Sequence, residues 1–182
     1  MNIYEHTKRV ASISAAFYNA GVSSAQVATY IKGDQVYINA SAYLTAIANI
    51  AFACETALKA QLPFLTRGHL LKDLFDKLDQ SSQDELIDYV CLESKGRSIN
   101  PNARYLNACK TKADFMTLLT EVDKIFADTR YLYEGNKVTK HFPRWFLEDF
   151  ARVCLSCYGY EAESETGLLH YTNGDDCMTL KV

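Results

Sequence analysis

Residues 54–78 read CETALKAQLPFLTRGHLLKDLFDKL, and they contain the end of one helix and the start of another. An apolar stripe at helical spacing leads into this stretch and predicts a central helix over residues 41–62, which Pro63 ends. A second stripe predicts a helix from about Gly68 to Leu78. The members of the two stripes are Leu44, Ile47, Ala51, Cys54, Leu58 and Leu62, and then Leu70, Leu71, Leu74, Phe75 and Leu78.

Three polar residues interrupt these apolar helices. Glu55 precedes Lys59 by four positions, the favourable order for an ion pair on a helix. His69 is expected in the first turn of the second helix, where its side chain can bond backbone groups left open at a helix end. We expect all three residues to be structural and to tie the central helix to its neighbours.

Helical spacing continues over most of the remaining chain. Residues 3–20 form one amphipathic segment, and Gly21 is expected to end it. The sequence from Ser82 to Glu85 fits a capping box, and Thr111 is expected to cap a helix that reaches about Glu134. Pro143 suits the first position of a last helix. Residues 92–110 lack any periodicity and are expected to be a long loop.

One short segment has the alternation of strands instead. Apolar residues alternate on both sides of Lys32-Gly33-Asp34, which predicts a small β hairpin within residues 26–38. A short helix over residues 24–31 is the competing interpretation. The whole pattern predicts an all-α bundle of about five helices. We expect a single domain over residues 1–160 and a polar C-terminal tail over residues 161–182.

Composition narrows the classes of function. The net charge of −3 gives no overall attraction to nucleic acid, so any such contact requires a local patch. The start has no signal-peptide pattern and the apolar run over residues 42–54 is too short for a bilayer, so a cytoplasmic protein without membrane contact is expected. Six cysteines are then expected to be reduced. Dinucleotide, ATPase and hydrolase motifs are missing from the sequence, and neither a cofactor nor a metal is expected.

The order of three motifs is more specific. The segments ACETALKAQL, GHLLKDLFDKL and FADTRYLYE, in this order, resemble the HEPN superfamily over roughly residues 37–158. The resemblance implies a helical bundle, often a homodimer, in prokaryotic defence or toxin–antitoxin systems, with an antitoxin or a nucleotidyltransferase as partner. In well-understood members it also implies metal-independent RNase activity, based on an Arg followed four to six residues later by a His.

The chain departs from this nuclease motif. Arg67 precedes His69 by only two positions, and Arg130 precedes His141 by eleven. We therefore expect a binding and assembly module associated with RNA or with a defence partner. The alternative is a divergent metal-independent endoribonuclease, in which Arg130 stabilises charge on the phosphate and His141 or a tyrosine moves the proton.

The candidate site residues surround Pro143 and the helix before it. Arg130 is expected at the edge of an apolar face, where it either contacts phosphate or pairs with Glu134 to fix packing. The basic and aromatic residues near Pro143 either bind RNA or form a solvated loop. The catalytic candidates are Arg130, Tyr133, Glu134 and His141, and the RNA-binding candidates are Lys137, Lys140, Arg144 and Trp145. Cys154 and Cys157 share a helix face, and we favour core packing over a redox or zinc site.

Overall fold

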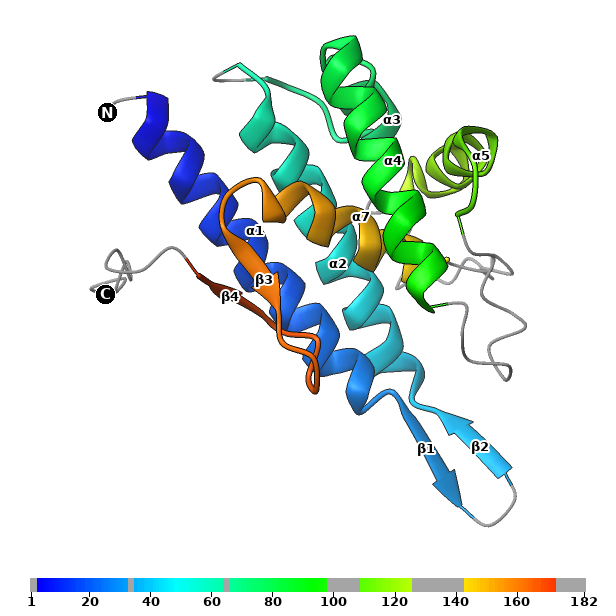
Figure 1. The fold of residues 1–182 in the computed structure, drawn as a ribbon. Coiled ribbons are helices and arrows are strands. Elements are labelled where there is room, and N and C mark those ends of the chain that lie inside the picture. The colour runs from blue at the N-terminus through cyan, green and yellow to red at the C-terminus, as the bar shows by residue number, and fades with distance from the viewer. Residues whose placement is uncertain (1–2, 33–34, 64–65, 98–108, 126–142, 173–182) are drawn as a thin grey trace.

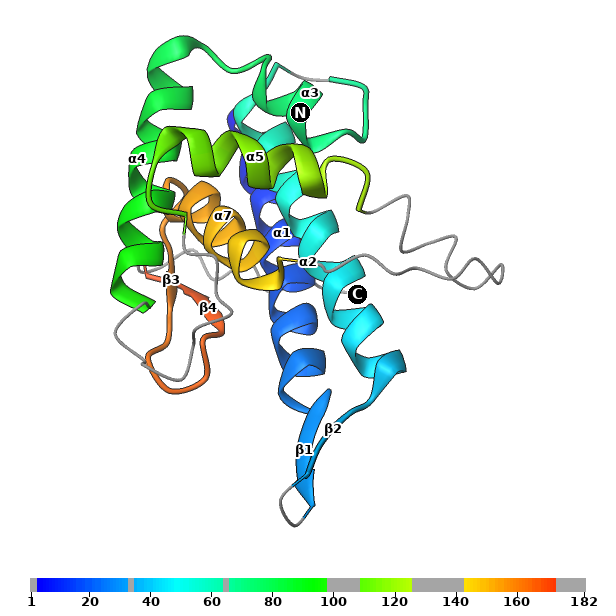
Figure 2. The same cartoon turned by 90° about the vertical axis from the view of Figure 1, so that its right-hand side faces the viewer.

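Two long antiparallel helices, α1 (Ile3–Gln26) and α2 (Ala40–Gln61), lie side by side along the length of the molecule (Figures 1 and 2). The computed structural model describes residues 3–32, 35–63, 66–97, 109–125 and 143–172. Strands β1 (Thr29–Lys32) and β2 (Gln35–Ile38) pair antiparallel, connect the two helices and project beyond their ends. The predicted hairpin is confirmed, and its pairing excludes the competing helix over residues 24–31.

Gly21 lies at the contact between α1 and α2. A Cβ atom at this position would lie 2.5 Å from Ile50 Cγ1 and 3.0 Å from the backbone oxygen of Ala46. About two turns of α1 before Gly21 the two helices also make a polar contact, because Ser14 Oγ donates to the carbonyl of Ala53 at 2.7 Å. The prediction that Gly21 ends the first helix is wrong: α1 continues to Gln26, and the glycine serves close packing.

Helix α2 is the core helix that its stripe predicts. Ile47, Ala51, Cys54 and Leu58 are fully buried. Among the described residues α2 is also the one helix long and apolar enough to cross a membrane, although half of its most apolar window is buried inside the fold. This is weak evidence for a membrane, because the core helix of a soluble protein passes the same test.

Four further helices complete the fold as described: α3 (Leu71–Phe75), α4 (Gln80–Arg97), α5 (Lys112–Val122) and α7 (Arg144–Ser156). Phe115 of α5 packs against α3 and α7. Its ring centroid lies 5.2 Å from that of Phe75 of α3, and 5.5 Å and 5.8 Å from those of Phe146 and Phe150 of α7. Helix α7 also packs on α2, where the Cys54 thiol donates to the carbonyl of Leu147 at 3.2 Å. The all-α bundle is confirmed.

The helix starts differ from the predictions in two places. Helix α3 begins at Leu71, because Gly68 adopts a φ of 124° that helical backbone cannot continue. Helix α4 begins one turn before the predicted capping box, because Asp79 accepts from Ser82 through both the backbone N–H (3.0 Å) and the hydroxyl (2.7 Å). It then runs to Arg97, into residues expected to be loop. The predicted cap of α5 is confirmed, since Thr111 and Asp114 form a reciprocal capping box.

A second hairpin follows α7, where a loose polar tail was expected. Strands β3 (Tyr160–Ala162) and β4 (Leu169–Tyr171) pair antiparallel, and β4 lies against α1. The Asn19 amide donates to the Leu169 carbonyl at 2.9 Å and accepts from the Leu169 N–H at 2.7 Å. At least residues 160–171 of this segment are therefore attached to the helices.

Candidate functional site

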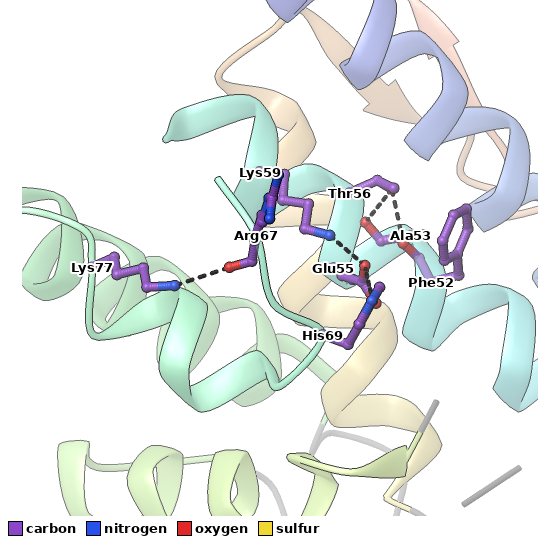
Figure 3. A network of polar contacts seen from close by, with 8 residues as sticks. All are labelled: Phe52, Ala53, Glu55, Thr56, Lys59, Arg67, His69 and Lys77. Atoms are coloured by element: carbon purple, nitrogen blue, oxygen red, sulfur yellow. Dashed lines mark hydrogen bonds and ion pairs between the residues drawn. The ribbon is translucent and has the colours of Figure 1, made fainter. Parts of the chain in front are cut away.

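A polar network joins the end of α2 to the segment that leads into α3 (Figure 3). Glu55 Oε1 accepts from Lys59 Nζ at 2.7 Å and lies 3.0 Å from His69 Nδ1. We call Glu55, Lys59, Arg67, His69 and Lys77 the α2–α3 elbow. The expectation that Glu55, Lys59 and His69 tie α2 to its neighbours agrees with these contacts, although His69 precedes α3 instead of lying in its first turn.

Burial differs sharply within the network. The Glu55 side chain is 2% exposed, whereas the His69 side chain is 72% exposed. Because a carboxylate oxygen only accepts, the shared hydrogen belongs to Nδ1, and Nε2 is the ring nitrogen left for solvent or a ligand. Glu55 Oε2 is buried and has no hydrogen-bond partner among the described residues. The elbow is therefore an exposed imidazole oriented by a buried carboxylate, an arrangement that can transfer protons.

Two further cations lie at the elbow. Lys77 Nζ donates to the carbonyl of Arg67 at 3.1 Å, so that its ammonium lies against the connection between the helices (Figure 3). Within the described part of the chain the Arg67 side chain is exposed and makes no ion pair. The sequence reasoning considered Arg67 only for its spacing to His69, and it did not consider Lys77.

The start of α7 is the second candidate site, and it contains the two predicted residues that the structure describes. Arg144 Nε donates to Glu148 Oε1 at 2.6 Å, and the Glu148 side chain is only 4% exposed. The Arg144 guanidinium lies 4.6 Å from the centre of the Trp145 ring, which is within cation–π range. Trp145 is 40% exposed. An arginine and an exposed tryptophan are thus fixed together at a helix start.

Tyr43 belongs to the same cluster. Burial raises the pKa of its hydroxyl above the ordinary value; the Arg144 cation opposes this increase, and the Glu148 carboxylate adds to it. Tyr43 therefore stays protonated at neutral pH and can donate a hydrogen bond. The i, i+4 spacing of Arg144 and Glu148 was visible in the sequence, but the contribution of Tyr43 from α2 was not.

The other predicted site residues lie outside the described residues. These are Arg130, Tyr133, Glu134, Lys137, Lys140 and His141. The contact of Arg130 with phosphate and its joint action with His141 therefore stay predictions. Cys154 is buried as expected for core packing, but Cys157 is exposed. The described residues contain no group of three or more side chains that could hold a metal ion.

A groove that the sequence did not predict lies between α4, α7 and the β3–β4 hairpin. Its volume is about 270 Å³, and Tyr89, Glu93, Arg152 and Tyr160 are among the residues that line it. Arg152 and Glu93 form an ion pair across it. Tyr89 and Glu93 lie on α4, Arg152 on α7 and Tyr160 on the hairpin, so the packing of these three elements brings together residues that are distant in sequence, which no local pattern indicates.

Comparison with known proteins adds no relative. No protein-family model, curated protein or solved structure matches this chain.

Proposed function

We propose that the chain is a HEPN-like helical module that binds single-stranded RNA and assembles with partners, without the usual nuclease chemistry. The observation that carries this proposal is the fixed pair of Arg144 and Trp145. Glu148 holds the guanidinium from a buried position, and the tryptophan keeps 40% of its surface exposed. Aromatic faces beside cations are the elements that bind unpaired bases and their phosphates.

Assembly is the second half of the proposal. The homodimer and the antitoxin or nucleotidyltransferase partner come from the resemblance in sequence. Exposed apolar side chains around the β1–β2 hairpin support an assembly role, since Val27 is 66% and Ile38 is 65% exposed. Such side chains gain free energy when a partner covers them.

Replacing Trp145 by alanine is expected to weaken RNA binding by about 5- to 150-fold. The stacking of one base on an aromatic ring is worth roughly 1–3 kcal/mol. Fluorescence anisotropy with a labelled single-stranded RNA in excess EDTA measures the dissociation constant, and the affinity of the wild type should decrease steeply with salt. Tyr89→Ala is the matched control, because Tyr89 is a 52% exposed aromatic residue on another helix, α4. Equal losses in both variants, or no binding by the wild type, would contradict the proposal.

The elbow favours the second candidate, a metal-independent endoribonuclease. A buried carboxylate that fixes one nitrogen of an exposed imidazole is a geometry suited to general acid–base catalysis. In this alternative His69 takes the proton-transfer role for which the sequence predicts His141 or a tyrosine.

His69→Ala separates the two candidates. We expect it to lower the free energy of unfolding by about 1 kcal/mol, the contribution of one hydrogen bond, and to leave labelled RNA intact in EDTA as in the wild type. Urea unfolding and an RNA cleavage assay measure the two effects, with His141→Ala as the matched control for cleavage. Cleavage by the wild type that is lost only in His69→Ala would favour the endoribonuclease.

A further inference from the structure

Two buried thiols contact each other between α4 and α5. Cys91 lies on α4, and Cys109 lies two residues before Thr111, the N-cap of α5. Their sulfur atoms are 3.4 Å apart. Cys91 is 6% exposed and Cys109 is 1% exposed, and both are free thiols.

The backbone holds both thiols in place. The Cys109 N–H donates to Ser94 Oγ at 2.9 Å, and Ser94 lies three residues after Cys91, on the same face of α4. On the other side of Cys109, Thr111 is fixed by its capping box with Asp114. A disulfide has an S–S distance of about 2.05 Å, so the sulfurs must approach by about 1.4 Å, a displacement within the reach of side-chain rotation.

We propose that Cys91 and Cys109 are a disulfide-forming modification site that a peroxide oxidises. The inference does not depend on the proposed function. It rests on the contact between the two sulfurs, on their shared burial and on the anchoring of Cys109 to α4.

The two thiols have different roles in the reaction. Burial raises the pKa of the Cys109 thiol well above its ordinary value; the hydrogen bond with Cys91 adds to this, as do the nearby carboxylates of Asp114 and Asp149. The Cys109 thiol is also the more deeply buried of the two, so a peroxide reaches it less easily. Cys91 is the more exposed thiol and reacts first.

The chemistry balances in two steps. The Cys91 sulfur loses its proton and attacks one peroxide oxygen, the O–O bond breaks, and the products are a Cys91 sulfenic acid and one water. The Cys109 sulfur then attacks the Cys91 sulfur, the S–O bond breaks, and the hydroxyl leaves with the Cys109 proton as a second water. Two thiols and one hydrogen peroxide thus give one disulfide and two waters.

The bond would connect α4 covalently to the start of α5. The two cysteines are 18 positions apart, so the disulfide closes a loop that the unfolded chain otherwise leaves open. The thermal midpoint of the oxidised protein should be higher than that of the reduced protein by roughly 5–10 °C.

The test uses the full chain treated with hydrogen peroxide and analysed by intact mass and by peptide mapping. We expect a loss of two hydrogens, one cross-link between Cys91 and Cys109, and reversal by dithiothreitol. Cys157→Ser, at an exposed cysteine, is the control and should keep the cross-link. Cys109→Ala should leave a Cys91 sulfenic acid that dimedone labels, whereas Cys91→Ala should leave Cys109 unlabelled.

The wild-type mapping does not depend on whether any variant folds. Addition of oxygen to Cys91 or Cys109 without a cross-link would overturn the proposal. So would a cross-link between other cysteines, or unmodified Cys91 and Cys109 peptides after exposure long enough to oxidise Cys157.

Discussion

Gly21→Ala is expected to lower the free energy of unfolding by about 2–3 kcal/mol, and Gly21→Val by more. The new Cβ would lie 2.5 Å from Ile50 Cγ1, 3.0 Å from the Ala46 oxygen and 3.1 Å from the Ile50 nitrogen. The shortest contact is with a side-chain atom, but the other two atoms belong to the backbone of α2, so rotation of the Ile50 side chain leaves both of these close contacts in place. The helices must move apart, although alanine itself favours a helix by about 1 kcal/mol over glycine.

Urea unfolding followed by circular dichroism measures this loss. Ser23→Ala is the matched control, because Ser23 is exposed on the same helix and its change should stay within about 0.5 kcal/mol. Ile50→Ala removes Cγ1, so a double-mutant cycle with Gly21→Ala should give a coupling energy that partly restores stability. A stabilising effect of Gly21→Ala would mean that α1 and α2 do not approach closely.

Lys59→Met is expected to lower the free energy of unfolding by about 2–3 kcal/mol. Removing one partner of a buried ion pair typically costs 3–5 kcal/mol, and we reduce this value because the Lys59 side chain is 24% exposed. The variant leaves the Glu55 carboxylate, 2% exposed, with His69 as its remaining partner in the network. Glu55→Gln should cost less, because a neutral amide oxygen still accepts hydrogen bonds and no charge stays buried.

The order of these two effects is the test, measured by urea unfolding. Lys72→Met is the matched control: Lys72 also pairs with an acid four residues away, but Lys72 and Asp76 are 36% and 46% exposed. Its loss of stability should be clearly smaller than that of Lys59→Met, because exposed ion pairs contribute little. If Glu55→Gln were less stable than Lys59→Met, the unpaired buried charge of Glu55 would not be the main cause of the lost free energy of unfolding.

The central helix and the first hairpin could be predicted because local signals determine them. The stripe from Ile47 to Leu58 has the period of a helix, and its members Ile47, Ala51, Cys54 and Leu58 are fully buried. The β1–β2 hairpin has alternating residues on both sides of Lys32-Gly33-Asp34, a sequence typical of hairpin connections. In both places the local preference and the tertiary environment agree.

The errors arose where tertiary contacts decide between local alternatives. Glycine fits a helix end and also a close helix crossing, and only the position of Ile50 shows that Gly21 belongs to the second class. Asp79 and Ser82 are both acceptable caps, and the earlier one is used. The β3–β4 hairpin has short strands, and its main anchor is Asn19 on a helix at the other end of the sequence.

In the candidate sites too, contacts between residues close in sequence could be predicted, whereas contacts that depend on the tertiary fold could not. The contact between Glu55 and Lys59 was readable from their spacing, and Arg144 and Glu148 have the same spacing. The contact of His69 with Glu55 depends on the path of the chain after Pro63, which spacing does not determine. Cys91 and Cys109 come together across a connection without periodicity, so their contact left no sign in the sequence.

The attachment of the β3–β4 hairpin to α1 has a consequence for the order of events during synthesis. Asn19 bonds a residue 150 positions later, and Gln26 bonds the Thr166 carbonyl 140 positions later. Closing such long loops costs entropy that a few hydrogen bonds do not offset until the helices are docked. While the chain is still on the ribosome, the face of α1 around Asn19 and Val22 stays uncovered. That face is accessible to chaperones or to another nascent chain until residues 160–171 emerge.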